Sequence, residues 1–412
     1  MKINNRGDIL KKYDVIIIGG GPAGLFSAIN IKNKKILLLE KNDIVGRKLL
    51  MAGAGRCNIT HSGKTNDFFE HYGKNYKFLK YALNEFKNSD LISFLESHNL
   101  ETIEDKNGKI FPKTEKSKDI QSLLLKLCLA NNVTINYKET VISAKKEKDS
   151  FFLETKKGSY KCKYLIIATG GKSYPTSGSS GDGYKMAKNL GHTITQCKPA
   201  LAPVLIENYI FSEIAGVSLK NKIINLYHNN KKIGEHKGDI GFTHTGLSGP
   251  GILDFSRYFS DGDLLKINLT NEKYDSLRET FINEAKKNGK SSISTFLKKY
   301  PIPKSLIKII LENSNINPTL QLANIDKKNR NKIILHLCEY PVIIKKVGDF
   351  NIAMATTGGI NLNEISPKKM ESKITKNLFF AGEVMDIDGD TGGYNIQAAF
   401  STSFLVSREI NR

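Results

Sequence analysis

The stretch YDVIIIGGGPAGLFSAI, residues 13–29, decides the predicted fold. It opens with the apolar run Val15–Ile18, which is rich in β-branched residues and ends at glycine, as a strand buried on both faces does. Gly19, Gly21 and Gly24 then form a G-x-G-x-x-G pattern at the start of a helix of small residues. In this pattern the first glycine permits a tight turn, the second lets the backbone approach a pyrophosphate, and the third lets helix and strand pack closely. We therefore expect a dinucleotide phosphate at the N-terminus of this helix.

A second apolar run, Ile36–Leu39, ends at Glu40. A carboxylate about twenty residues beyond the glycines accepts hydrogen bonds from the ribose hydroxyls of a dinucleotide. The following loop, residues 41–60, combines glycines with basic side chains, which suits a wall around an extended anionic ligand. Strand, helix, second strand and acid occur in the expected order, so the sequence predicts an α/β fold with a Rossmann-like site.

The later part of the chain repeats this pattern of an apolar strand followed by glycines. Tyr164–Thr169 is a third apolar strand that ends at a Gly-Gly pair, and Leu378–Ala381 is a fourth, followed by Gly382 and Glu383. An acidic loop then leads to Gly393, where a helix is expected to begin. The chain thus has a dinucleotide site near one end and a second glycine–acid–helix segment near the other. This arrangement indicates one long ligand that is held at both ends.

FAD fits this arrangement better than NAD. The ribityl chain of FAD offers hydroxyl groups, and Glu383 is placed to accept their hydrogen bonds. The reduced flavin carries negative charge, which the N–H groups of a helix that starts at Gly393 would stabilise. The sequence has no second G-x-G-x-x-G for a nicotinamide cofactor, so NAD(P)H is expected only as a transient co-substrate.

The middle of the chain has a different pattern, with prolines and short alternating runs and then helical periodicity. This change predicts a discontinuous FAD-binding domain, residues 1–195 and 346–412, and an inserted domain, residues 196–345. Within the insert we expect a β part over about residues 196–245 and a helical part over about residues 246–340.

Six stretches resemble the BaiN/RdsA-like family of NAD(P)/FAD-dependent oxidoreductases, also called YhiN-like or aminoacetone-oxidase-like. Ala52 and Ala54 stand where this family commonly has Ser and Gly, and His61 stands where Asn is common. The resemblance implies a glutathione-reductase-like flavoprotein in which a Rossmann-like FAD-binding domain is interrupted by a β subdomain and a helical subdomain. The stretches span nearly the whole chain and read DVIIIGGGPAGL, GRKLLMAGAGRCNIT, ATGGKSYPTSGSSGDGY, FTHTGLSGPGIL, TTGGI and FFAGEVMDIDGDTGGYNIQAAFSTS.

The glycine pattern and the resemblance together give a set of expected FAD-binding residues, in which Val141 would meet the adenine through its backbone. The set is Gly19, Gly21, Pro22, Ala23, Gly24, Glu40, Lys41, Gly46, Arg47, Lys48, Gly55, Arg56, Cys57, Asn58, Val141, Ala168, Thr169, Gly170, Gly382, Glu383, Gly393, Asn395 and Ile396.

Three residues are candidates for catalysis, and each of them could instead have a purely structural role. Cys57 lies in the flavin-side loop, but a lone cysteine is more often a packing residue. His244, in a glycine-rich turn of the insert, and Tyr174, after the third strand, could donate a proton or anchor a substrate. The acidic loop after Glu383 has calcium-loop spacing but lacks the Gly and Glu of an EF-hand, so we expect a solvated turn and no metal.

The composition of the chain narrows the possible classes of partner and cellular location. The 412 residues carry a formal charge of +21, but the lysines are scattered and no nucleic-acid-binding module is evident, so we expect no nucleic-acid partner. The five cysteines contain no C-x-x-C pair, and no apolar run has the length of a signal peptide or a membrane span. These features are typical of a reduced cytoplasmic protein; the oligomeric state stays open.

The sequence leaves three functions open. The first is FAD-dependent hydride or electron transfer to or from a small molecule, with NAD(P)H as the expected donor. The second is a flavoprotein that binds or modifies tRNA, which the charge would favour. The third is a flavin-carrying interaction protein without turnover.

Overall fold

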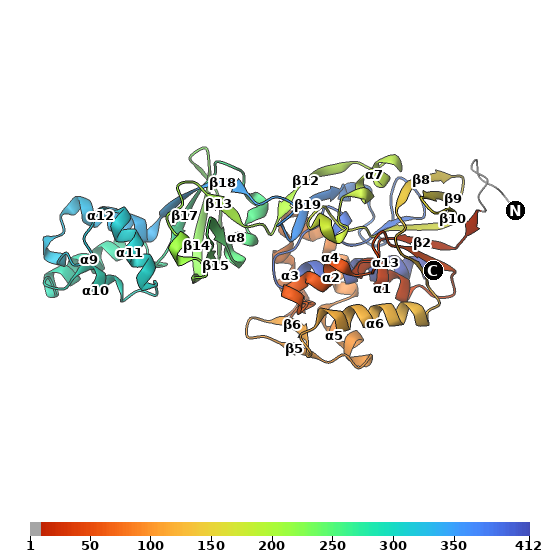
Figure 1. Cartoon of the computed structure of the whole chain (residues 1–412), viewed down its shortest axis with the longest axis horizontal. Helices are drawn as coiled ribbons and strands as arrows, with labels where there is room; N and C mark the ends of the chain where they lie inside the picture. The colour runs from red at the N-terminus through yellow and green to blue at the C-terminus, as the bar shows by residue number, and fades with distance from the viewer. Residues whose placement is uncertain (1–9) are drawn as a thin grey trace. The chain divides into compact units, whose positions relative to one another are not determined.

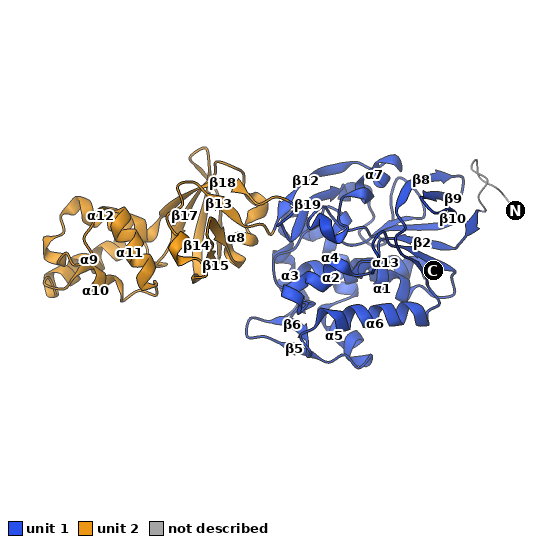
Figure 2. Ribbon diagram, in the orientation of Figure 1, with its two compact units in different colours: residues 1–200, 350–412 blue, residues 201–349 orange. Residues whose placement is uncertain are grey.

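The computed structural model describes residues 10–412 (Figure 1). Its internal contacts divide the chain into two compact units (Figure 2). The first combines the chain up to Ala200 with Phe350–Arg412, and the second is Leu201–Asp349. The second unit begins and ends a few residues later than the predicted insert. The first nine residues, which bear on the expectation about export, lie outside the described part of the chain.

The centre of the first unit is a parallel five-stranded sheet in the order β20-β11-β2-β3-β7. Its inner strands are buried apolar runs, as predicted for a sheet covered on both faces. Helices α1 and α13 pack on each other, with the rings of Phe26 and Phe400 edge to face at 4.9 Å. The bounds are β2 Val15–Ile18, α1 Pro22–Asn30, β3 Ile36–Leu39, β7 Thr134–Asn136, β11 Tyr164–Ile167, β20 Leu378–Phe380 and α13 Tyr394–Asn411.

Smaller elements complete this unit. The sheet β1-β10-β9-β8 contains the antiparallel pair of β9 and β10, and two further small sheets are β4-β6-β5 and β12-β19. The strands are β1 Lys11–Lys12, β4 Thr60–His61, β5 Thr102–Glu104, β6 Lys109–Pro112, β8 Val141–Glu147, β9 Ser150–Thr155, β10 Ser159–Cys162, β12 Ile194–Ala200 and β19 Ala355–Ile360. The helices are α2 Arg47–Met51, α3 Thr65–Phe68, α4 Tyr76–Glu85, α5 Asn88–Ser97, α6 Ser117–Ala130 and α7 Asp182–Asn189.

The second unit is a closed β-barrel in the order β13-β16-β15-β14-β17-β18, with a helical part between its last two strands. Each part contributes to one continuous apolar core. The strands are β13 Val204–Ile206, β14 Ser218–His228, β15 Lys231–Phe242, β16 Gly246–Ser248, β17 Leu264–Asn268 and β18 Tyr340–Val347. The helices are α8 Pro250–Leu253, α9 Tyr274–Lys287, α10 Ile293–Leu297, α11 Lys304–Asn313 and α12 Lys327–Cys338.

The predicted division of the insert into a β part and a helical part is wrong. β16 and β17 lie inside the range expected to be helical, and β18 begins at the last residue of that range, because all three strands are needed to close the barrel. The start of the insert is also misplaced: β12 covers residues 196–200 and pairs with β19 of the first unit. In each case a distant strand supplies the hydrogen-bonding partner, which local periodicity does not reveal.

Within residues 10–412, no helix is long and apolar enough to cross a membrane. The same residues contain no group of three or more His, Cys, Asp or Glu side chains placed to hold a metal ion.

Candidate functional site: a dinucleotide cradle

The glycine turn has the geometry that the sequence predicts. Gly19 follows β2 with a φ of +105°, a conformation that favours glycine. A Cβ on Gly24 would lie 1.9 Å from the carbonyl oxygen of Gly19, so helix and strand pack at a distance that only glycine permits. A Cβ on Gly21 would meet no atom within 4 Å. The space above Gly21 is therefore open, as a pyrophosphate requires.

The N-terminus of α1 is chemically suited to an anion. Its N-cap, Gly21, makes no side-chain cap bond, Pro22 and Ala23 open the helix, and the first turn contains no acid. The first turn of α1 therefore offers its N–H groups and the positive end of the helix dipole to an anion, with no acidic side chain of its own.

Glu40 is buried beside this turn. Its Oε2 accepts a 2.8 Å hydrogen bond from the N–H of Gly20, and its Oε1 accepts two 2.8 Å bonds from the backbone and side chain of Asn42. A carboxylate offers about four acceptor positions, so one remains for a ribose hydroxyl.

The basic side chains after Glu40 have different surroundings. Lys41 pairs with Asp182 at the start of α7, at 2.7 Å. Arg47 is half exposed and lies 3.9 Å from Asp43. Arg56 is half exposed, forms a 3.3 Å ion pair with Glu115 and covers the ring of Phe111.

Lys48 is the cation that the fold brings to the second half of the site. Its Nζ lies 2.9 Å from Oε2 of Glu383 and 2.9 Å from the hydroxyl of Ser173. The other oxygen of Glu383 accepts bonds from the N–H of Thr356 at 2.8 Å and from the Ser173 hydroxyl at 3.2 Å. Glu383 is thus anchored by three separate segments of the first unit, and its side chain is 18% exposed.

The structure also describes the surroundings of the remaining predicted residues. Gly46 (φ +66°), Gly55 (φ +87°), Gly170 (φ +70°), Gly382 (φ +74°) and Gly393 (φ +93°) all adopt the left-handed backbone that favours glycine. The side chain of Asn58 donates to the carbonyls of Thr60 and Ile110. Buried Ala168 directly follows β11 and precedes half-buried Thr169. Val141 is the buried first residue of β8, and Ile396 is half-buried in the first turn of α13.

Ala54 takes a left-handed conformation, with φ +56°, directly after Gly53 at φ +58°. The backbone of this loop thus keeps a glycine-type turn although the side chain is alanine, which costs about 1–2 kcal/mol relative to glycine.

The loop after Glu383 is not the solvated turn that the sequence predicts. Asp386 and Asp388 are each only 7% exposed. Asp386 accepts a 3.0 Å bond from the N–H of Gly358. The side chain of Asn395 makes two bonds to Gly389, accepting from its N–H at 2.8 Å and donating to its carbonyl at 2.7 Å. The loop therefore forms a wall that is held in place by hydrogen bonds from β19 on one side and from the start of α13 on the other.

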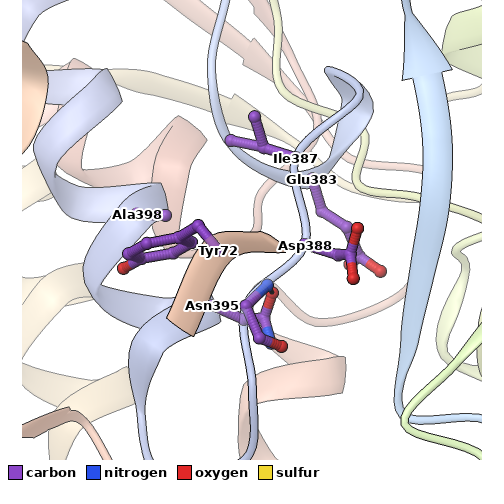
Figure 3. A pocket seen from close by; sticks show the side chains of 7 residues that line it. Tyr72, Glu383, Ile387, Asp388, Asn395 and Ala398 are labelled. Carbon is purple, nitrogen blue, oxygen red and sulfur yellow. Dashed lines mark hydrogen bonds between the residues drawn. The ribbon is translucent and has the colours of Figure 1, made fainter. Parts of the chain in front are cut away.

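A pocket opens beside this wall (Figure 3). The carboxylates of Glu383 and Asp388 point to the same side of the loop, and Asn395 lies below them. The complete lining is Tyr72, Glu383, Ile387, Asp388, Gly389, Asn395 and Ala398.

Sequence reasoning missed an aromatic cluster at the start of α13. The ring of Tyr394 stacks on His71 at 4.0 Å and on His61 at 5.3 Å. Nδ1 of His71 lies 2.9 Å from a carboxylate oxygen of Asp390, and the hydroxyl of Tyr72 donates to the carbonyl of Tyr394. The unusual His61 was the one visible signal; the His71–Asp390 pair spans 319 positions of sequence and has no local signature.

The three catalytic candidates also have distinct environments. Cys57 is fully buried, and burial raises the pKa of its thiol to about 12, so it is protonated and a poor nucleophile at neutral pH. His244 is exposed in the turn between β15 and β16 of the second unit. Tyr174 is half-buried, has φ +55°, and directly follows the Ser173 that contacts Glu383.

The fold and this cradle define a Rossmann-type FAD-binding flavoprotein with an additional barrel and helical part. Residues 13–409 match the family model described as the HI0933-like protein Rossmann domain. The chain belongs to this family of FAD-binding oxidoreductases, which agrees with the resemblance read from the sequence.

Two relatives share the name "Ribosomal RNA dihydrouridine synthase". That of Escherichia coli is 32% identical over 410 residues, 97% of this chain and 98% of the relative, and that of Haemophilus influenzae is 30% identical over 407 residues, 96% and 98%. The "3-dehydro-bile acid delta(4,6)-reductase" of Clostridium scindens is 27% identical over 408 residues, 95% and 97%.

Among solved structures, the 3-ketosteroid-delta4-(5alpha)-dehydrogenase of Rhodococcus jostii has a TM-score of 0.52 at 12% identity and covers 98% of this chain and 97% of that one. A flavocytochrome c3 fumarate reductase has a TM-score of 0.51 at 16% identity, with coverage of 97% and 78%. At these identities the likeness shows the fold alone.

Proposed function

We propose that the protein is an FAD-dependent reductase that saturates the C5=C6 double bond of a uracil base in ribosomal RNA. The observation that supports this most strongly is the near-complete match to two relatives named for dihydrouridine synthesis. RNA as substrate departs from two expectations drawn from the sequence, a small-molecule substrate and no nucleic-acid partner. It would make the net charge of +21 favourable for binding an anionic substrate.

The residues present fit FAD. The open space above Gly21 and the uncapped start of α1 would hold the pyrophosphate, and Glu40 keeps one acceptor position for the ribose. Glu383 would accept from the ribityl hydroxyls, and the N–H groups after Gly393 would face the electron-rich end of the flavin. FAD, when bound and reduced, supplies a hydride equivalent.

Saturation of a uracil ring requires a hydride at C6 and a proton at C5. We place the proton on the hydroxyl of Tyr174, because this residue directly follows Ser173, whose hydroxyl bonds to Glu383. Its left-handed backbone, held by a 2.8 Å bond from its N–H to the carbonyl of Phe350, is the kind of strained geometry that clusters at functional sites. NAD(P)H is the proposed source of the electrons.

The test is direct. The purified holoprotein is incubated anaerobically with NADH or NADPH and an unmodified transcript of ribosomal RNA, which is then digested and analysed for dihydrouridine by mass spectrometry. Formation of dihydrouridine supports the proposal, and Gly21→Val serves as the flavin-free control. Absence of dihydrouridine in both the transcript and the corresponding ribosomal subunit overturns it.

One observation favours a second candidate, the reduction of a small conjugated ketone. The relative from Clostridium scindens is named for a reductase of delta(4,6) double bonds in 3-dehydro bile acids and also matches almost the whole chain. A parallel reaction with a 3-keto-4,6-diene steroid acid, followed by ultraviolet absorbance, distinguishes the two.

A further inference from the structure

The helical part of the second unit has one end at which two separate basic segments meet. Helix α9 ends at Lys287 and helix α12 begins at Lys327. The residues before α9 lie beside the end of α12, since the N–H of Leu269 bonds to the carbonyl of Leu337 at 2.8 Å. The residues after α9 lie beside the approach to α12, since the N–H of Ala323 bonds to the carbonyl of Gly289 at 3.1 Å. The two helices are therefore antiparallel, and the end of α9 adjoins the start of α12.

This juxtaposition gathers six cations, which we call the basic end. The five lysines are exposed and the arginine is half-buried. Within residues 10–412, none of the six is in an ion pair. The basic end consists of Lys286, Lys287, Lys290, Lys327, Lys328 and Arg330.

The two nearby carboxylates have hydrogen-bonding partners outside the basic end, and Glu284 also interacts electrostatically with Lys287. Glu284 is paired with Lys299 at 2.7 Å and accepts a further bond from Asn288. The hydrogen bond from Lys299, with that from Asn288, keeps the pKa of Glu284 below its usual value, so it stays ionised in that pair. Asp326 caps α12, accepting from the N–H of Asn329 at 2.7 Å.

Helix α12 begins with one acid, the N-cap Asp326, followed by the three cations Lys327, Lys328 and Arg330. Its first turn contains no further acid, and Lys327 and Lys328 lie at the positive end of the helix dipole. An anion bound here would be stabilised by Lys327 and Lys328 together with the lysines at the end of α9 and just after it. Because the cations are spread over two segments, they suit a ligand with several spaced negative charges.

We infer that the basic end binds the phosphate backbone of the RNA substrate. This inference rests on the proposed function, and it adds a binding surface to the flavin site that reads the base. Contacts of lysine to phosphate position an RNA without reading its sequence. The basic end would therefore increase the affinity for RNA but would not select which uridine is reduced.

The experiment compares two triple variants of the FAD-loaded protein. The test variant is Lys286→Gln, Lys290→Gln and Lys328→Gln. The control variant removes the same charge from exposed lysines of the first unit: Lys106→Gln, Lys145→Gln and Lys156→Gln. Affinity for a fluorescein-labelled oligouridine is measured by anisotropy over a range of salt concentrations.

We expect the test variant to bind about ten- to a hundredfold more weakly, and its slope of log K against log salt to fall by about two, because each phosphate contact on a single strand contributes about 0.7. The control variant should remain within about threefold of the wild type. Equal losses in both variants, or no loss in the test variant, overturn the basic end as the surface. Failure of the wild-type protein to bind any RNA overturns the proposed substrate as well.

Discussion

At the scale of single residues, Glu383 joins the two halves of the candidate site. Its carboxylate is held by Lys48, Ser173 and Thr356, and it lines the pocket beside the clamped acidic loop. A surface acid would have none of these contacts. Because of these contacts, loss of the Glu383 carboxylate is expected to change the stability of the protein as well as its affinity for a ligand.

We predict that Glu383→Ala weakens FAD by about one to two orders of magnitude, because charge-assisted hydrogen bonds contribute about 1.5–3 kcal/mol. Glu383→Gln keeps an acceptor oxygen and should lose less. Quenching of FAD fluorescence during titration of the apoprotein gives the dissociation constants. Equal constants for Glu383→Ala and the wild type would contradict the prediction.

The stability of the apoprotein must be measured alongside, since Glu383→Ala also leaves Lys48 and the N–H of Thr356 without their partner. The double variant Lys48→Met/Glu383→Gln removes both charges and is the matched control.

Gly21→Val should abolish FAD binding and leave the fold intact. The structure has open space at this position, so a side chain meets no protein atom but occupies the place of the pyrophosphate. The purified variant should be colourless, with a melting temperature equal to that of wild-type apoprotein. A yellow variant with bound flavin would refute the assignment.

Tyr174→Phe should lower the rate of dihydrouridine formation by about two to four orders of magnitude, the usual contribution of general acid catalysis. Reduction of the flavin by NAD(P)H should be unchanged, because that step needs no proton from Tyr174. Stopped-flow measurement of the two half-reactions separates these effects. A slower flavin reduction with unchanged product formation would rule out the assigned role.

At the scale of elements, the contact between β2 and α1 sets the geometry of the cradle. The helix can approach the strand only because Gly24 has no side chain, whereas Gly21, three residues earlier, has no steric limit from the protein. Two glycines of one motif thus serve different purposes, one for packing and one for the ligand.

Gly24→Ala should therefore destabilise the first unit, by about 1–3 kcal/mol or more, because its Cβ would overlap the carbonyl of Gly19. Urea denaturation monitored by circular dichroism measures the loss. Gly21→Ala is the matched control and should change the free energy of unfolding by less than about 1 kcal/mol. Equal stability of the two variants would show that the packing is not as tight as described.

At the scale of the whole molecule, the second unit is one continuous segment with its own core and a barrel closed by its first and last strands. β13 and β18 pair at Val204 and Val347, so the two ends of the segment lie together. Such an insertion needs no contact from the other unit to complete its hydrogen bonds.

We predict that residues 201–349 fold alone, with one cooperative thermal transition that FAD does not shift. In the intact chain, FAD should raise only the transition of the first unit, because a ligand stabilises the unit that binds it. Differential scanning calorimetry of the fragment and the full chain, with and without FAD, tests both statements. An unfolded fragment would contradict the independence of the second unit.

Much of the first unit could be read from the sequence because its signals are local. The run Val15–Ile18 is apolar throughout, which suits only a strand covered on both faces, and the glycines that follow fix the turn. Local order also pointed to Glu40, which directly follows the buried strand β3, and to Glu383, which comes three residues after the end of β20. The family resemblance rested on the same short stretches.

Only the tertiary structure decided which residues far apart in the chain are in contact. Lys48 and Glu383 are 335 positions apart, and His71 and Asp390 are 319 apart. Nothing in either segment specifies its partner; packing of the sheet and its helices brings them together. The same reason hid β16 and β17 in an apparently helical region, and it created the basic end from two ordinary lysine-rich segments. Local chemistry determines which elements form, and the closed arrangement of those elements determines which charges become neighbours.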